Sequence, residues 1–283
     1  MKKKKRLFLF AAFDPKDVHN GIIHDSLIMY IRELSKLGDI VFFQDNDTKS
    51  ELKEIAPFVL FANVKRHGEY DFGSYKYGYL WAKNNNLLNN YNWIYLVNDS
   101  VYAPLHPLGP IIEDLETKDV DVTGMVFTAR KKRSHIQSWF VGISKKIFMS
   151  DVFDSFITSV TKHENKRAVY KYEDGFTELC NQKKWSYDTA YCVRNREIYN
   201  NIKGLFCKGL PFMKKKAFKR KCGALGRQVQ YVLNHTSPEL RSAIIKNVEY
   251  LYGKEYVNRF LTGNLLKIAY RNIQYLCSKL LKH

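Results

Sequence analysis

Three small polar residues follow an apolar run near the middle of the chain, and their types suit ligand binding. The run is WIYLV at residues 93–97, and Asn98, Asp99 and Ser100 come directly after it. In α/β sheets, ligands bind at the carboxyl ends of strands, because the loops there are free of the packing that fixes the strand. Asp99 could hold a divalent cation or a ribose hydroxyl, and its neighbours could hydrogen-bond the same ligand. A simple polar turn explains the tripeptide equally well.

Other charged residues stand near predicted strand or helix ends. Asp71 and Lys76 flank a glycine in DFGSYK, a pattern typical of a helix start, where backbone NH groups meet caps or anions. Asp14 ends the first predicted strand, at the edge where nucleotide-binding sheets meet their ligands. We therefore expect Asp14, Asp71 and Lys76 to contribute to a ligand site. Capping, and for Asp14 a turn at Pro15, are the alternative explanations.

Two adjacent carboxylates, Glu173 and Asp174, stand at a predicted helix start in YEDG. The helix macrodipole favours acids there, so capping is the ordinary explanation. Either carboxylate could instead take a proton as a general base. His135 and Gln137 precede an apolar run and could bind hydroxyl groups, although a lone histidine is more often structural. The basic loop 130–133 before them could neutralise an anion or simply be solvated.

A sheet must position these residues, and the hydrophobic pattern predicts one. Apolar runs of strand length alternate with stretches of helical spacing, which predicts an α/β fold with a mostly parallel sheet flanked by helices. The predicted strands are residues 6–13, 40–44, 58–63, 93–97 and 119–127, with a strand or strand pair at 185–193. The predicted helices are residues 22–37, 75–88, 111–115, 152–160 and 172–183, and another begins at Pro238.

Five blocks of sequence in a fixed order resemble the rhamnan-synthesis protein F family of bacterial polysaccharide glycosyltransferases. They are YDFGSYKYG, LVNDSVYAP, HIQSWFVGISKKIF, YEDGFTELCNQKKW and GLPFMKK, and the similarity spans about residues 6–216. The resemblance implies a GT-A-like, Rossmann-related fold. It also implies transfer of rhamnose or galactofuranose from a nucleotide-activated donor to a cell-surface polysaccharide or lipopolysaccharide.

The resemblance gives the candidate residues roles in glycosyl transfer. Negative charge grows on the leaving diphosphate and must be stabilised, and an inverting enzyme needs a base for the acceptor hydroxyl. Glu173, and less so Asp174, is the expected base, and His135 and Gln137 are expected at donor or acceptor hydroxyls. The expected donor-binding residues are Asp14, Asp71, Lys76, Asn98, Asp99 and Ser100.

Asp99 is also the candidate ligand for a divalent cation, Mn²⁺ or Mg²⁺. Many GT-A enzymes carry two acids around one intervening position for the metal, whereas the tripeptide from Asn98 to Ser100 retains a single acid. The sequence therefore leaves open whether catalysis requires the metal.

The composition indicates a cytosolic protein with an anionic partner. The chain has 283 residues and a formal net charge of +18, which predicts attraction to nucleic acid, an acidic membrane face or a phosphorylated substrate. Its five cysteines include no CxxC pair, which argues against a zinc ribbon or a thioredoxin-like site and favours reduced thiols. Residues 1–6 resemble the basic start of a signal peptide, but the apolar run after them ends at Asp14, so we prefer a first buried strand.

We expect a GT-A-like domain over residues 1–212 and a basic, helical extension over residues 213–283. Positive charge is concentrated at residues 214–221, and residues 256–283 form a basic amphipathic stretch. Such segments can lie on an anionic membrane; we favour that role for 214–221, and packing on the protein for 256–283. The predicted location is cytoplasmic and peripheral, at the inner face of the bacterial cytoplasmic membrane, with a lipid-linked or polysaccharide acceptor.

Two other functions stay open on the sequence. The charge, with 19 Tyr and 18 Phe that could stack on bases, would suit a nucleic-acid-binding protein. Many of these aromatic residues fall in apolar runs, and no zinc finger, RNP-type motif or GXXG loop in a suitable setting is visible, so we expect no nucleic-acid partner. The reduced metal motif also leaves room for an inactive scaffold of a polysaccharide-assembly complex.

Overall fold

A computed structural model describes residues 5–16, 23–47, 52–130, 133–162, 166–219 and 223–280. The chain forms two compact units. Unit 1 comprises residues 1–23, 30–99 and 107–195, and unit 2 comprises residues 24–29, 100–106 and 196–283. Residues 196–212, which the sequence assigned to the first domain, thus lie in unit 2.

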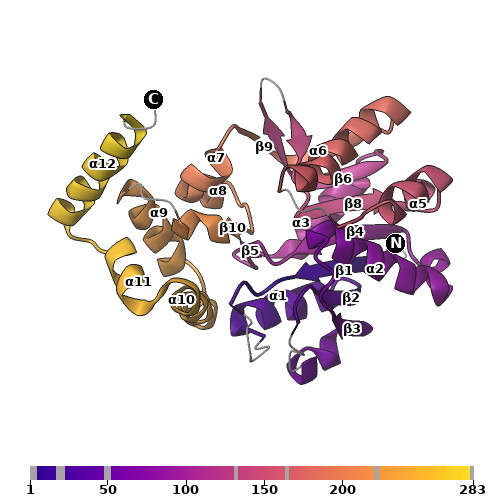
Figure 1. The fold of residues 1–283 in the computed structure, drawn as a ribbon, viewed down its shortest axis with the longest axis horizontal. Coiled ribbons are helices and arrows are strands. Elements are labelled where there is room, and N and C mark those ends of the chain that lie inside the picture. Colours follow the sequence, from indigo (N-terminus) through magenta and orange to yellow (C-terminus); the bar gives the residue numbers. More distant parts are fainter. Residues whose placement is uncertain are drawn as a thin grey trace. The chain divides into compact units, whose positions relative to one another are not determined.

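Unit 1 is built on one eight-stranded sheet (Figure 1). The sheet order is β3-β2-β1-β4-β8-β6-β7, and β9 also pairs with β6. Pairing is parallel among β3, β2, β1 and β4 and between β6 and β9, and antiparallel at β8 and β7. The strands are β1 (Arg6–Ala12), β2 (Asp39–Gln44), β3 (Phe61–Val64), β4 (Trp93–Asn98), β6 (Val122–Ala129), β7 (His135–Ile136), β8 (Phe140–Ser144) and β9 (Tyr187–Arg194). The predicted α/β fold with a mostly parallel sheet is confirmed.

Helices flank this sheet, and α2, α5 and α6 share one apolar core with it. The core includes Tyr79 of α2, Phe153 of α5 and Phe176 of α6. The α-helices that include residues of unit 1 are α1 (Asp25–Ser35), α2 (Tyr70–Asn84), α3 (Leu108–Thr117), α4 (Lys145–Phe148), α5 (Asp151–Thr158) and α6 (Lys166–Lys183). Short 3-10 helices cover Leu52–Glu54, Ala56–Phe58, Leu88–Asn90 and, in unit 2, Lys215–Lys219.

Two helices begin earlier than the sequence predicted. Helix α2 begins at Tyr70, so Asp71 lies within its first turn. Helix α6 begins at Lys166, so the predicted helix start at Glu173 is wrong and this carboxylate lies about two turns inside the helix. The basic residues before it are good helix formers, and they extend a helix whose Tyr172, Phe176 and Cys180 face the core at four-residue spacing. Capping therefore does not explain Glu173.

Unit 2 consists mainly of helices around a second apolar core, which includes Val229, Ile244 and Phe260. A two-stranded ladder pairs β5 (Val101–Tyr102) with β10 (Met213–Lys214). The helices are α7 (Glu197–Asn200), α8 (Ile202–Cys207), α9 (Gly223–Asn234), α10 (Pro238–Tyr252), α11 (Lys254–Phe260) and α12 (Leu265–Leu280). Ser237 caps α10 by accepting a hydrogen bond from the Leu240 NH, so the predicted start at Pro238 is confirmed.

The predicted amphipathic stretch 256–283 is divided between two helices. Helix α11 ends at Phe260, and α12 begins at Leu265. The Asn264 side chain accepts hydrogen bonds from the Leu266 NH at 3.0 Å and the Lys267 NH at 3.1 Å, which caps the new helix. Among the helices in the described part of the chain, none has both the length and the apolar composition needed to cross a bilayer.

A buried ionic contact joins three elements of unit 1 at the amino edge of the sheet. Arg6 of β1 donates to Glu116 of α3 through Nε at 2.6 Å and Nη2 at 2.9 Å. The Tyr95 hydroxyl of β4 donates to the same carboxylate at 2.8 Å, and Arg6 also donates to the Leu37 carbonyl at 3.2 Å. Both charged side chains are almost completely buried. Because the two charges are buried and hydrogen-bonded to each other, removing one partner would leave the other buried without its counter-ion.

Glu116→Gln should destabilise unit 1 by about 3 kcal/mol or more, because the Arg6 charge loses its buried counter-ion. Urea unfolding followed by tryptophan fluorescence measures this, since Trp81, Trp93, Trp139 and Trp185 all lie in unit 1.

The matched control is Lys36→Gln, which removes an exposed ion pair with Glu33. It should change the free energy of unfolding by less than about 0.5 kcal/mol. Equal effects of the two substitutions would contradict a special role for the buried contact.

A second polar contact fixes the loop that leads into α2. Asp45 accepts hydrogen bonds from the backbone NH groups of His67 at 2.8 Å and Gly68 at 3.0 Å. The Glu69 NH donates to His67 Nδ1 at 3.0 Å, so the ring proton is on Nε2, which donates to the buried Ser74 hydroxyl at 3.0 Å. In this tautomer His67 cannot take a proton from Ser74, so the three side chains are not a nucleophilic triad. They hold the start of α2 in place.

Burial lowers the pKa of His67 below its ordinary value of 6.5, with the nearby Asp45 carboxylate opposing the shift. The folded state therefore prefers neutral His67 more than the unfolded state does. Stability from this group is present above about pH 6.5 and is lost as the pH falls toward the lower, folded pKa.

The free energy of unfolding should thus fall between pH 7 and pH 5, and His67→Gln should make this fall smaller. Urea titrations at several pH values check it. His235→Gln, at an exposed position of unit 2, is the control, and an equal change in pH dependence for both variants would contradict the assignment to His67.

Candidate functional site

The carboxyl ends of β1, β2 and β4 lie side by side. Ala12 pairs with Gln44, and Ala11 pairs with Asn98, so the polar residues that follow these strands reach one edge of the sheet. Strand β8 runs antiparallel to β4 and pairs Phe140 with Val97, which brings the segment before β8 to the same edge. Parallel sheets bind ligands at such an edge.

Asn98 connects β4 to the start of α2. Its side chain is almost completely buried, and Nδ2 donates to Asp71 Oδ2 at 2.8 Å. Its backbone NH donates to the Trp139 carbonyl at 3.3 Å, and the Asp99 NH donates to the Ala11 carbonyl at 3.1 Å. Two of the predicted donor-binding residues, Asp71 and Asn98, are therefore in direct contact.

Glu173 joins the same region through Ser138 and Tyr75. The buried Tyr75 hydroxyl donates to the Ser138 carbonyl at 3.1 Å, and the Ser138 hydroxyl donates to Glu173 Oε1 at 3.1 Å. Burial raises the pKa of Tyr75 well above its ordinary range, and the charges of Asp71 and Glu173 raise it further. Candidates from three separate sequence blocks thus surround one tyrosine. We refer to them as the Tyr75 cluster, which consists of Asp71, Tyr75, Asn98, Ser138 and Glu173.

Asp174 has different partners, because adjacent residues on a helix point about 100° apart. Its Oδ1 lies 3.3 Å from His135 Nδ1, and its Oδ2 lies 3.9 Å from the exposed Arg133. Burial raises the pKa of Asp174, the neighbouring Glu173 adds to this rise, and His135 and Arg133 oppose it. The two adjacent acids therefore have different surroundings: Glu173 belongs to the Tyr75 cluster, and Asp174 lies opposite His135.

Two predicted residues are engaged inside unit 1. Gln137 Nε2 donates to Thr128 Oγ1 at 2.7 Å, and its Oε1 accepts from the Trp139 indole NH. Lys76 is buried, forms an ion pair with Glu69, and donates to the Val160 carbonyl at 2.8 Å. Ser100, at the start of a unit 2 segment, accepts a hydrogen bond from Lys214 Nζ at 2.8 Å.

Asp14 belongs to a polar network that sequence reasoning missed. Its backbone NH donates to Asn46 Oδ1 at 3.0 Å, and Asn46 Nδ2 donates back to the Asp14 carbonyl at 2.8 Å. Gln44 Nε2 also donates to Asn46 at 3.0 Å, while the Asp14 carboxylate accepts from the Lys16 NH at 2.9 Å. The signal was available, because the residues after Ile40–Phe43 are polar in the same way as those after β4.

Among the described residues, no group of three or more His, Cys, Asp and Glu side chains lies close enough together to hold a metal ion. Within the described ranges, Asp99 is therefore not part of such a group. Mg²⁺ is commonly held by one or two carboxylates together with substrate phosphates. Of the predicted basic loop, Arg130 and Arg133 are exposed, and Lys131 and Lys132 lie outside the described residues.

Solved structures with a similar arrangement come from several kinds of protein. One, from Desulfovibrio desulfuricans G20 and provisionally assigned as a nucleotide-diphospho-sugar transferase, has 11% identity and a TM-score of 0.41, covering 81% of this chain and 96% of that chain. Core-mannan synthase A of Aspergillus fumigatus, in a Mn/GDP form, has 13% identity and a TM-score of 0.34, covering 66% and 73%. A cytidylyltransferase of Leptospira borgpetersenii has 10% identity and a TM-score of 0.37, covering 89% and 97%. No curated protein sequence matches the chain.

The family comparison covers most of the sequence. The profile described as rhamnan synthesis protein F matches residues 45–282, a range that contains every candidate site residue except Asp14. The resemblance seen in the sequence blocks is confirmed. The chain therefore belongs to the rhamnan synthesis protein F family and is a glycosyltransferase.

Proposed function

We propose that this glycosyltransferase moves a sugar such as rhamnose or galactofuranose, with inversion, onto a growing cell-surface polysaccharide or lipopolysaccharide. The observation that carries the proposal is the Tyr75 cluster at the carboxyl end of β4, where three predicted residues converge. Family membership supports the class of donor and product. The parallel half of the sheet is compatible with a GT-A-like fold.

The donor is proposed to bind along the carboxyl edge of β1 and β4. Asp99 follows β4 directly and is partly exposed, so its carboxylate can reach a ribose hydroxyl or a cation held by the diphosphate. Asn98 and Asp71 hold each other, which keeps this corner of the site in one arrangement before the donor arrives. A bound Mn²⁺ or Mg²⁺ would stabilise charge on the leaving diphosphate.

Glu173 is the proposed base for the acceptor hydroxyl. A carboxylate has about four lone-pair positions, so the hydrogen bond from Ser138 orients it while other positions can accept from a substrate. Glu173 is partly exposed and lies in the interior of α6, where a base is held more rigidly than on a loop. Asp174 is proposed to position His135, since its carboxylate is already opposite that ring.

Glu173→Gln should lower kcat by about 10²- to 10⁴-fold, because the amide cannot accept the proton. The KM for the donor should change little. Release of nucleoside diphosphate from UDP- and dTDP-sugars measures the rate, with water replacing the unknown acceptor.

Glu178→Gln is the matched control, since Glu178 lies on the same helix and is exposed. This substitution should leave kcat within about twofold of the wild type, because surface substitutions away from a site usually have small effects. A rate for Glu173→Gln equal to that of this control would remove Glu173 from the role of base.

Asp99→Asn should weaken binding of the matching nucleotide, UDP or dTDP, at least about tenfold, because a charged ligand group is lost. Calorimetric titration with and without Mn²⁺ separates two roles. Metal ligation predicts that Mn²⁺ strengthens binding to the wild type and not to the variant. A ribose contact predicts the same loss with and without the metal. Unchanged affinity under both conditions would exclude Asp99 from the donor site.

A further inference from the structure

The positive charge of this protein is concentrated in one part of the chain. Residues 196–283 contain 18 lysines and arginines and four aspartates and glutamates, against 46 and 28 in the whole chain. From residue 256 to the end, no acidic residue occurs. A surface with this charge attracts an anionic partner, and its apolar residues decide which kind.

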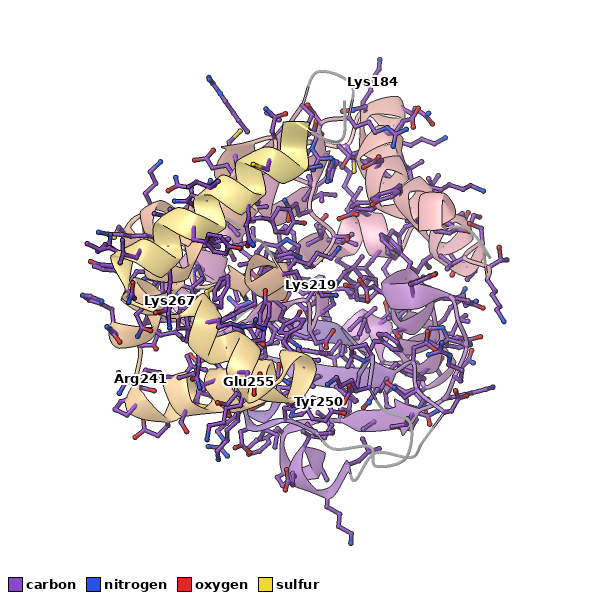
Figure 2. All side chains as sticks on the ribbon, turned by 60° about the vertical axis from the view of Figure 1, so that its left-hand side comes forward. Lys184, Lys219, Arg241, Tyr250, Glu255 and Lys267 are labelled. Atoms are coloured by element: carbon purple, nitrogen blue, oxygen red, sulfur yellow. The ribbon has the colours of Figure 1, made fainter. Side chains whose placement is uncertain are left out.

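The basic run at residues 214–221, expected to contact a membrane, is divided between Lys214 and Lys215, which have partners within unit 2, and Lys216 and Lys219, which are exposed. Lys214 is buried and donates to Ser100, and the Lys215 ammonium lies 5.6 Å from the centre of the Tyr102 ring. Phe218 is also buried. Lys219, labelled in Figure 2, is exposed and lies 5.9 Å from the centre of the Tyr252 ring. Residues 220–222 lie outside the described residues.

Helix α12 shows the opposite arrangement, with apolar side chains toward solvent. Leu266 is 82% exposed, Tyr270 is 62% exposed and Ile273 is 59% exposed. Their spacing of four and three residues places them on one side of the helix, which we call the apolar stripe of α12. Ile268, two positions after Leu266 and so on the opposite side, is buried where α12 packs beside α9 (Figure 1).

Basic residues accompany this stripe. Lys267, labelled on α12 in Figure 2, is exposed, and Arg271 and Lys279 belong to the same helix. The described part of α12, 16 residues, is long enough to lie flat at a membrane surface.

We propose that α12 binds an anionic lipid surface, with the apolar stripe at the headgroup boundary and the exposed Lys267 on a lipid phosphate. The inference rests on the proposed function, since a transferase with a lipid-linked acceptor works where that lipid lies. Nucleic acid would leave the exposed leucine and isoleucine without a partner. A second copy of the chain would bring two strongly basic surfaces together, which is electrostatically unfavourable.

Flotation of the full chain with lipid vesicles tests the proposal without an activity measurement. The wild type should float with vesicles of phosphatidylcholine and phosphatidylglycerol in equal parts, less at high salt, and weakly with phosphatidylcholine alone. The triple variant Leu266→Ser, Tyr270→Ser, Ile273→Ser should reduce the vesicle partition coefficient about tenfold or more, because it removes the apolar contact.

The matched control is Leu60→Ser, Met149→Ser, Tyr170→Ser, which removes three exposed apolar side chains from unit 1. It should bind vesicles like the wild type. Equal binding by both triple variants would overturn the proposal. The proposal would also be overturned if the wild type does not bind vesicles and binds a duplex oligonucleotide instead. The same holds if the wild type does not bind vesicles and forms a dimer that the α12 variant abolishes. If the wild type binds vesicles but does not hydrolyse any nucleotide-sugar, the result would count against the proposed function and would still support lipid binding by α12.

Discussion

The buried contact between Arg6, Glu116 and Tyr95 constrains the geometry of unit 1. A buried ion pair adds little net stability compared with apolar packing, but a shifted strand or helix would leave one of its charges without a partner. The contact therefore favours a single register of β1 against β4 and of α3 against both. Because β1 is held in register with β2 and β4, the three parallel strands end at the same level of the sheet. The polar residues at their carboxyl ends therefore lie at one edge.

Much of this arrangement could be predicted from the sequence, because β1, β2 and β4 are buried on both faces and read as continuous apolar runs. The polar residues after β4 were identified for the same reason. Gln44 ends an equally clear strand and Asn46 lies two positions beyond it, and both were overlooked, although their network with Asp14 lies at the same edge.

The contacts that turn candidates into a site could not be predicted, because they join residues far apart in the sequence. Ser138 reaches Glu173 across 35 positions, and Asn98 reaches Asp71 across 27. Gly73 suggested a helix start, but its role is close approach: a Cβ there would come within 2.7 Å of the His67 ring. Charge was equally ambiguous in sequence, since Lys76 and Lys214 look like surface lysines and are buried.

The position of Glu173 and Asp174 inside α6 has a consequence for how this helix can change. Each residue added or removed in a helix rotates everything beyond it by about 100°. An insertion of one residue between Asp174 and Phe176 would turn the two acids away from Ser138 and His135, or turn Phe176 and Cys180 off the core. Substitutions on the exposed side of α6 leave the directions of the two acids and of the core residues unchanged. Among homologous chains, α6 should therefore vary in sequence far more readily than in length.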